Sequence, residues 1–153
     1  MKPLFLLLTL SFFTLVFTSC EVKKQPIAYG QANCAHCQMT VSDKRYGAET
    51  VLKTGKALFF DSAECLIQHL EENADVKDKA QMFLVTNFNK PEDLLDADKA
   101  IFLQSKNLPS PMGMFLTAFE NQAAATEMYK QQGGRILTWN EAVQAVKNNE
   151  KPQ

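Results

Sequence analysis

Residues 48–70 read AETVLKTGKALFFDSAECLIQHL and predict a β-hairpin followed by a helix. Two β-prone segments, Ala48–Lys53 and Lys56–Phe60, flank the turn residues Thr54-Gly55. This pattern is typical of a β-hairpin, because turn residues between two β-prone segments let the chain reverse and pair with itself. We therefore expect two antiparallel strands here.

A helix should follow the hairpin directly. Asp61 is a suitable N-cap, and Glu64 at the third helical position can reach back to the cap. Four apolar residues have the i, i+3, i+4, i+7 spacing of one buried helix face: Ala63, Leu66, Ile67 and Leu70. The segment Gln81–Phe88 then predicts a third strand, which completes a ββαβ unit over about residues 48–88.

The same order of elements recurs in the second half of the chain. Lys99–Gln104 and Met114–Phe119 are predicted strands, and Asn121 caps a predicted helix that ends at a Gly-Gly pair. Arg135–Leu137 predicts a closing strand, so a second ββαβ unit spans about residues 99–137. The fold class is therefore α+β, with two consecutive ββαβ units of antiparallel strands.

A last helix is predicted after the second unit. Thr138 and Glu141 have the spacing of a capping box. The apolar residues expected to be buried by this helix are Trp139, Ala142, Val143 and Val146. Residues 149–153 form a polar tail. We expect one domain over residues 34–148, since about 130 mature residues is an ordinary domain size.

The amino terminus indicates secretion. Lys2 precedes an apolar run over residues 4–17, which is shorter than the roughly 20 residues of a membrane-spanning helix, and small residues lead to Cys20. This arrangement resembles a bacterial lipobox, which implies that residues 1–19 are a lipoprotein signal peptide and that the Cys20 sulfur carries lipid. The chain would then be anchored to a membrane and face the periplasm, and Glu21 slightly favours the outer membrane. An ordinary signal peptide cleaved nearby is the alternative.

The mature chain has no strong charge. Residues 20–33 are polar and aperiodic, which predicts a flexible tether between the anchor and the domain. Removing Lys2 with the signal peptide leaves 15 of the 16 basic residues against 17 acidic ones. This balance lacks the basic face that nucleic-acid binding needs. The apolar content suffices for a core without disulfides, so three cysteines are available for chemistry.

Residues 34–39 read CAHCQM and concentrate sulfur ligands in one place. Cys34 and Cys37 are separated by two residues and can turn both sulfurs towards one ion, and Met39 adds a neutral thioether. Thiolate and thioether donors favour copper(I) over hard cations such as magnesium or calcium. A site with few ligands also leaves the ion open to the donors of a recipient protein. The motif therefore predicts a site for copper(I) that is bound and passed on.

A disulfide, half of a zinc site or a thiol-disulfide oxidoreductase centre could also explain the Cys34/Cys37 pair. A closed zinc site usually takes four ligands, and Cys65 is the only cysteine further along the chain. A redox pair normally begins a helix after a βαβ unit, and the segment before Cys34 is too short for such a unit. The periplasmic oxidoreductase is the main alternative function.

Two further places carry possible ligands. The stretch PSPMGM, residues 109–114, holds Met112 between a proline and a glycine, where a methionine has little packing role. Met114 is expected in the core. Cys65 and His69 are four residues apart and share a helix face, but a buried cysteine and a surface histidine explain them more simply than a metal site does.

Together these residues resemble the NosL family, the accessory lipoproteins of nitrous oxide reductase. The likeness covers about residues 34–140 and is carried by Cys20, Cys34-Ala35-His36-Cys37-Gln38-Met39, Phe60-Asp61-Ser62, Met112-Gly113 and Gly133-Gly134. It implies a protein that is not an enzyme and has a fold of two ββαβ units. It further implies that the chain carries copper(I) to nitrous oxide reductase, together with a membrane copper-transfer complex.

The family pattern also implies the ligands. Cys37 and Met39 match its Cys-Gly-Met core, Cys34 matches its upstream cysteine, and Met112 matches its Met-Gly methionine. The chain departs from the pattern at Gln38, where the family usually has glycine. The resemblance thus implies that Cys34, Cys37, Met39 and Met112 hold the copper(I) ion between the two ββαβ units.

Overall fold

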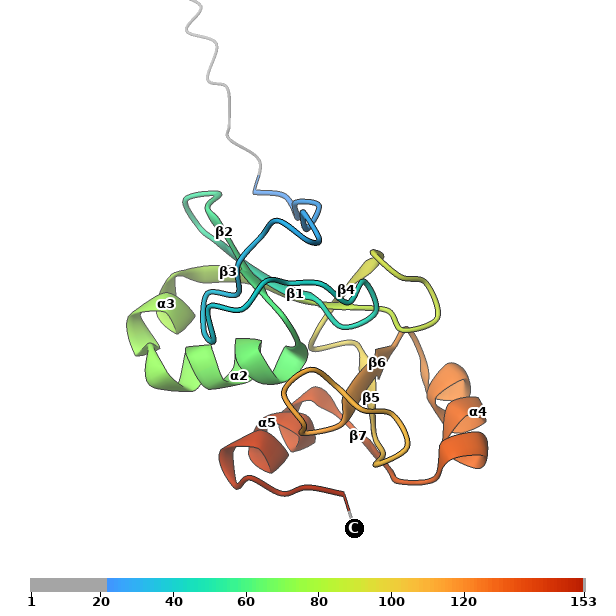
Figure 1. Ribbon diagram of the computed structural model, residues 1–153. Helices are drawn as coiled ribbons and strands as arrows, with labels where there is room; N and C mark the ends of the chain where they lie inside the picture. Colours follow the sequence, from blue (N-terminus) through green and yellow to red (C-terminus); the bar gives the residue numbers. More distant parts are fainter. Residues whose placement is uncertain (1–21, 153) are drawn as a thin grey trace, which may run out of the picture.

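The computed structural model describes residues 22–152 and contains two antiparallel sheets with helices packed against them (Figure 1). The first sheet has the order β2-β1-β3-β4 and consists of β1 (Ala48–Leu52), β2 (Ala57–Phe60), β3 (Ala80–Thr86) and β4 (Leu94–Asp96). The second has the order β6-β5-β7 and consists of β5 (Ile101–Gln104), β6 (Leu116–Phe119) and β7 (Arg135–Leu137). The predicted signal peptide and Cys20 lie outside the described residues.

The helices complete two units of the same topology. They are α2 (Ala63–Glu72), α3 (Ala74–Lys79), α4 (Gln122–Gln132) and α5 (Trp139–Lys147). In each unit the first strand is central and pairs antiparallel with the strand that follows it and with the strand after the helices. The prediction of an α+β fold with two ββαβ units and a carboxyl-terminal helix is confirmed.

The helix caps are those predicted from the sequence, except that the cap of α2 lies one residue later. Ser62, not Asp61, caps α2: its backbone is extended (φ −159°) and its hydroxyl accepts a hydrogen bond from the Cys65 N–H at 3.4 Å. The Asp61 carboxylate instead accepts a hydrogen bond from the backbone of Ser42. The predicted cap at Asn121 and the capping box of α5 are confirmed.

The strands differ most from the prediction at β4 and β6. The short edge strand β4 lies in a segment for which no strand was predicted. β6 begins at Leu116 instead of Met114, because Phe115 has a positive φ of 63° and breaks the extended run. Met114 is 4% exposed, so it is a core residue as expected.

The segment predicted to be a flexible tether packs on the domain instead. The backbone N–H of Gln25 donates to the Glu49 carboxylate at 2.9 Å. Ile27 is 8% exposed, and the Tyr29 hydroxyl lies 3.2 Å from the hydroxyl of Thr86. Residues 25–33 are therefore held against the first sheet by contacts that cross more than twenty positions of the sequence.

One hydrophobic core joins the two units. It includes Phe60 and Leu66 from the first unit and Phe102 and Leu116 from the second, all at most 1% exposed. A smaller cluster around Phe119 lies between the second sheet and α4. The two units therefore form a single packed body. Within residues 22–152, no helix is long and apolar enough to cross a membrane.

The buried Glu49 makes stability depend on pH. Burial raises the pKa of its carboxyl to about 7, and the hydrogen bond from Gln25 only partly opposes this shift. The folded chain therefore keeps a proton that the unfolded chain loses at lower pH. The free energy of unfolding should fall as the pH rises from about 4.5 to about 7, by on the order of 3 kcal/mol.

Urea unfolding at pH 5 and pH 8 tests this expectation. Glu49→Gln should remove most of the difference in unfolding free energy between the two pH values. An equal pH dependence in both chains would show that another group is responsible.

Candidate metal centre

The CAHCQM motif, residues 34–39, forms a tight loop between two residues that pair with each other. Asn33 pairs with Thr40 in an antiparallel bridge that closes the loop. Inside it, the Cys34 N–H donates to the Met39 carbonyl at 2.8 Å, and the Gln38 N–H donates to the Cys34 carbonyl at 3.0 Å. Gln38 has a φ of 65°, in the left-handed region that favours glycine. This conformation gives a physical reason why a glycine suits that position.

The loop docks where β2 ends and α2 begins. The Ala35 N–H donates to the Phe59 carbonyl at 2.8 Å, so the loop extends the edge of the hairpin. Ser62 starts α2 three residues later, which places Cys65 in the first turn of the helix. The hairpin and its helix therefore bring Cys65 to the cysteines of the loop.

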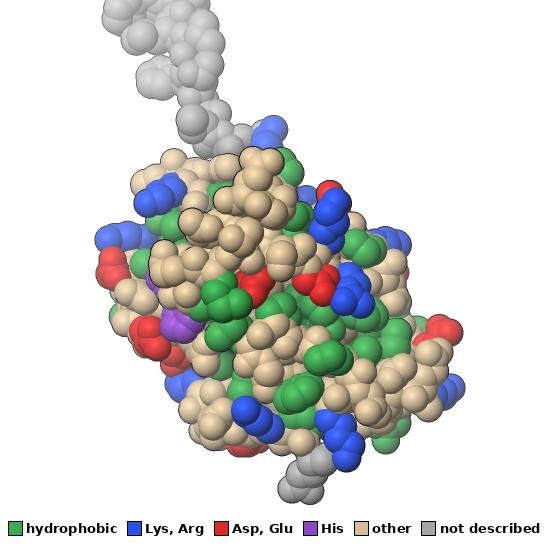
Figure 2. All heavy atoms as spheres, viewed as in Figure 1, with side chains coloured by type: hydrophobic (Ala, Val, Ile, Leu, Met, Phe, Trp, Pro, Cys, Tyr) green, Lys and Arg blue, Asp and Glu red, His purple; other side chains and the backbone are tan. Residues whose placement is uncertain are grey.

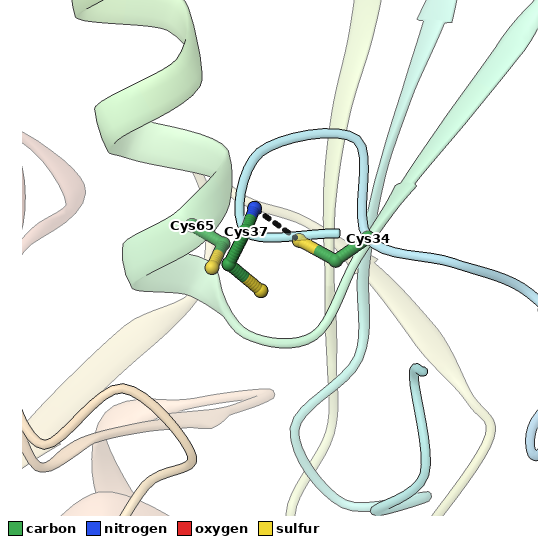
Figure 3. A group of neighbouring side chains, drawn as sticks. All are labelled: Cys34, Cys37 and Cys65. Atoms are coloured by element: carbon green, nitrogen blue, oxygen red, sulfur yellow. Dashed lines mark hydrogen bonds between the residues drawn. The ribbon is translucent and has the colours of Figure 1, made fainter. Parts of the chain in front are cut away.

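Three thiols converge at this junction (Figure 3). The sulfur atoms of Cys34, Cys37 and Cys65 all lie within 4.8 Å of one another. Cys34 and Cys65 are fully buried, Cys37 is half-buried, and all three are free thiols. The Cys37 N–H points to the Cys34 sulfur at 3.5 Å. One small ion could contact all three sulfurs.

The three thiols share their protons unequally. A hydrogen bond from the Cys65 thiol is the main cause that lowers the pKa of Cys34 to about 4, against the opposing effect of burial. The pKa of Cys65 is raised for the same reason, since its proton is held by the neighbouring sulfur. Burial raises the pKa of Cys37. At neutral pH the cluster thus contains one thiolate beside two thiols, a soft anionic site for a metal cation.

Comparison with known proteins identifies the family. Residues 27–146 match the protein family NosL. The chain belongs to the NosL family. It is also similar to the crystal structure of the copper chaperone NosL from Shewanella denitrificans, with 21% sequence identity, coverage of 79% of this chain and 96% of that chain, and a TM-score of 0.67. At this identity the likeness shows the fold. A comparison with curated proteins finds no match.

The predicted ligands of this NosL-family chain occupy different environments. Cys34 and Cys37 are together in the thiol cluster. The side chain of Met39 is 54% exposed at the end of the loop. Met112 is half-buried and packs against the core cluster that contains Cys34 and Cys65. The two predicted thioether ligands therefore differ in their surroundings: Met39 is exposed to solvent and Met112 packs on the core.

Cys65 is the member of the centre that the sequence prediction assigned to the core. Its expected helix partner His69 packs instead against the ring of Phe60, with ring centroids 5.3 Å apart. His69 also lies edge-on to His36 at 6.3 Å, and burial lowers the pKa of His69. The sequence offered one indication that Cys65 belongs to the thiol cluster, namely its position in the first turn of the helix that directly follows the hairpin.

Proposed function

We propose that this chain binds copper(I) and delivers it to nitrous oxide reductase, instead of catalysing a reaction. The proposal depends above all on one observation, that the sulfur atoms of Cys34, Cys37 and Cys65 all lie within 4.8 Å of one another. Thiolates are soft donors and suit copper(I) better than magnesium, calcium or manganese. The structure of a related NosL described as a copper chaperone supports the same choice of metal.

Delivery requires that a recipient can reach the ion. Met39 is 54% exposed and Cys37 is half-buried, so two sulfur side chains of the loop are open to solvent. Hydrophobic side chains gather between α2 and the second sheet on the face drawn in Figure 2. An apolar surface on the carrier favours close approach of a partner, whose own donors could then replace those of the carrier one at a time.

The buried thiolate argues against the alternative of a thiol-disulfide oxidoreductase. An attacking thiolate must reach the disulfide of a substrate, and Cys34 is fully buried. In addition, the Cys34/Cys37 pair lies in a turn and not at the start of a helix. These features suit a ligand held for a metal better than an exposed nucleophile.

The proposal includes a location. Cys20 follows a secretion signal in a lipobox-like sequence, so we place the carrier on a membrane, facing the periplasm and attached through lipid on Cys20. Its partners there would be nitrous oxide reductase and a membrane copper-transfer complex.

A transfer experiment tests delivery. The reduced full chain is loaded with one copper(I), mixed under anaerobic conditions with copper-free nitrous oxide reductase, and separated from it before copper is measured in each. We expect most of the copper in the reductase. A copper enzyme from another pathway serves as the control recipient. Copper that stays with the carrier, or that reaches both recipients equally, would contradict delivery to this enzyme.

A further inference from the structure

The loop that carries Met112 is tied to one buried carboxylate on α2. Ser110 donates its hydroxyl to Glu64 Oε1 at 2.5 Å, and the Leu116 N–H donates to the same oxygen at 3.1 Å. These two donors stand at the two ends of the loop over residues 110–116. Glu64 is 0% exposed. A single oxygen therefore fixes both ends of the loop.

The loop is also braced internally. The Phe115 N–H donates to the Ser110 hydroxyl at 2.8 Å, and the Gly113 N–H donates to the Ser110 carbonyl at 3.1 Å. The Gln104 side chain donates to the Met114 carbonyl at 2.9 Å. A loop closed by these bonds holds its shape, so the position of its ends determines the position of Met112.

A buried carboxylate is a costly way to fill a core. Burying a charged or polar group is unfavourable unless hydrogen bonds compensate it, and an apolar residue would pack there without that cost. Within residues 22–152, the second oxygen of Glu64 is buried and has no hydrogen-bond partner. Packing alone does not explain this side chain, whereas its two bonds to the loop do.

Glu64 connects the first ββαβ unit to the loop of the second unit that carries Met112. Glu64 directly precedes Cys65 in the first turn of α2, which belongs to the first ββαβ unit. The loop with Met112 belongs to the second unit, 46 positions further along the chain at Ser110. In Figure 1 this loop, coloured orange ahead of β6, lies beside the start of α2.

We infer that Glu64 is a positioning residue for copper(I) binding, which holds the Met112 thioether of the second unit beside the three thiols of the first. The inference rests on the proposed copper function. Glu64 acts through the loop, so its effect on affinity depends on Met112 being present.

A double-mutant cycle tests this dependence. Copper(I) affinity of the reduced full chain is measured against a competing chelator for Glu64→Ala, Met112→Ala and the double variant. We expect Glu64→Ala to weaken binding by about tenfold, as is typical when a residue that orients a ligand is lost. In the Met112→Ala background the same change should have almost no effect. Glu64→Gln keeps an acceptor oxygen for Ser110 and Leu116 and should restore most of the affinity.

Two controls make the cycle decisive. Ser110→Ala removes one bond from the loop side without changing α2, so it replaces Glu64→Ala if that variant does not fold. Met128→Ala alters a methionine packed in the second, separate cluster and should leave affinity unchanged.

Equal losses for Glu64→Ala with and without Met112 would overturn the inference, since a general loss of structure acts in both backgrounds. Unchanged binding in Met112→Ala would also overturn it while leaving copper binding by the thiols intact. Absence of copper(I) binding in the unaltered chain would overturn the proposed function as well.

Discussion

Replacing Cys34 with serine should lower the affinity of the chain for copper(I) by at least roughly a hundredfold. A structural zinc site of four ligands binds its ion with about 10–16 kcal/mol, so the loss of one ligand costs about 3 kcal/mol. Cys34 is the thiolate of the cluster at neutral pH, because its pKa is lowered to about 4. A hydroxyl is a hard, neutral donor in the same place. Competition between the reduced full chain and a copper(I) chelator measures the loss.

The substitution is small enough to separate binding from folding. Serine has nearly the shape of cysteine, so far-ultraviolet circular dichroism of the metal-free variant should match that of the unaltered chain. Cys37→Ser, which removes a half-buried thiol, provides a comparison within the same loop. Unchanged affinity in a folded Cys34→Ser chain would exclude this sulfur as a ligand.

Replacing Cys65 with alanine should raise the pKa of Cys34 from about 4 towards the usual thiol value near 8.5, because the hydrogen bond from Cys65 is the main cause of the low value. The unaltered chain should then hold one thiolate per molecule at pH 6, and Cys65→Ala should hold almost none. Ultraviolet absorbance of the thiolate, followed from pH 3 to pH 10, measures the fraction ionised.

Serine at the same position is the matched control. Cys65→Ser retains a hydrogen-bond donor and should keep much of the lowered pKa of Cys34. Subtracting the absorbance of Cys34→Ser assigns the signal to Cys34. Identical titrations in the unaltered chain and Cys65→Ala would mean that another group ionises Cys34.

The parts of the fold that depend on local sequence could be predicted. The hairpin of β1 and β2, the helix after it and the capping box of α5 each need only residues a few positions apart. The repeat of the ββαβ unit follows because the same local pattern occurs twice. Even here, the prediction that Asp61 caps α2 was wrong. Asp61 bonds to the loop before β1, and Ser62 caps the helix.

The parts that depend on distant contacts could not be predicted. The segment after residue 24 is held by a hydrogen bond from Gln25 to Glu49, and no local pattern in that segment predicts this contact. The thiol cluster is similar: Cys34 and Cys37 were identified from their spacing, but Cys65 joins them only because the loop bonds to Phe59. Glu64 looked like a capping residue and instead binds a loop of the other unit.

X-ray absorption at the copper edge of the reduced full chain, loaded with one equivalent of copper(I), shows which donor atoms bind the ion. If soft donors from the two units converge on the ion, the coordination shell consists mainly of sulfur, and Met112→Ala removes part of the sulfur signal. A shell of nitrogen and oxygen, or copper lost on desalting, would show that these sulfur atoms do not hold copper(I).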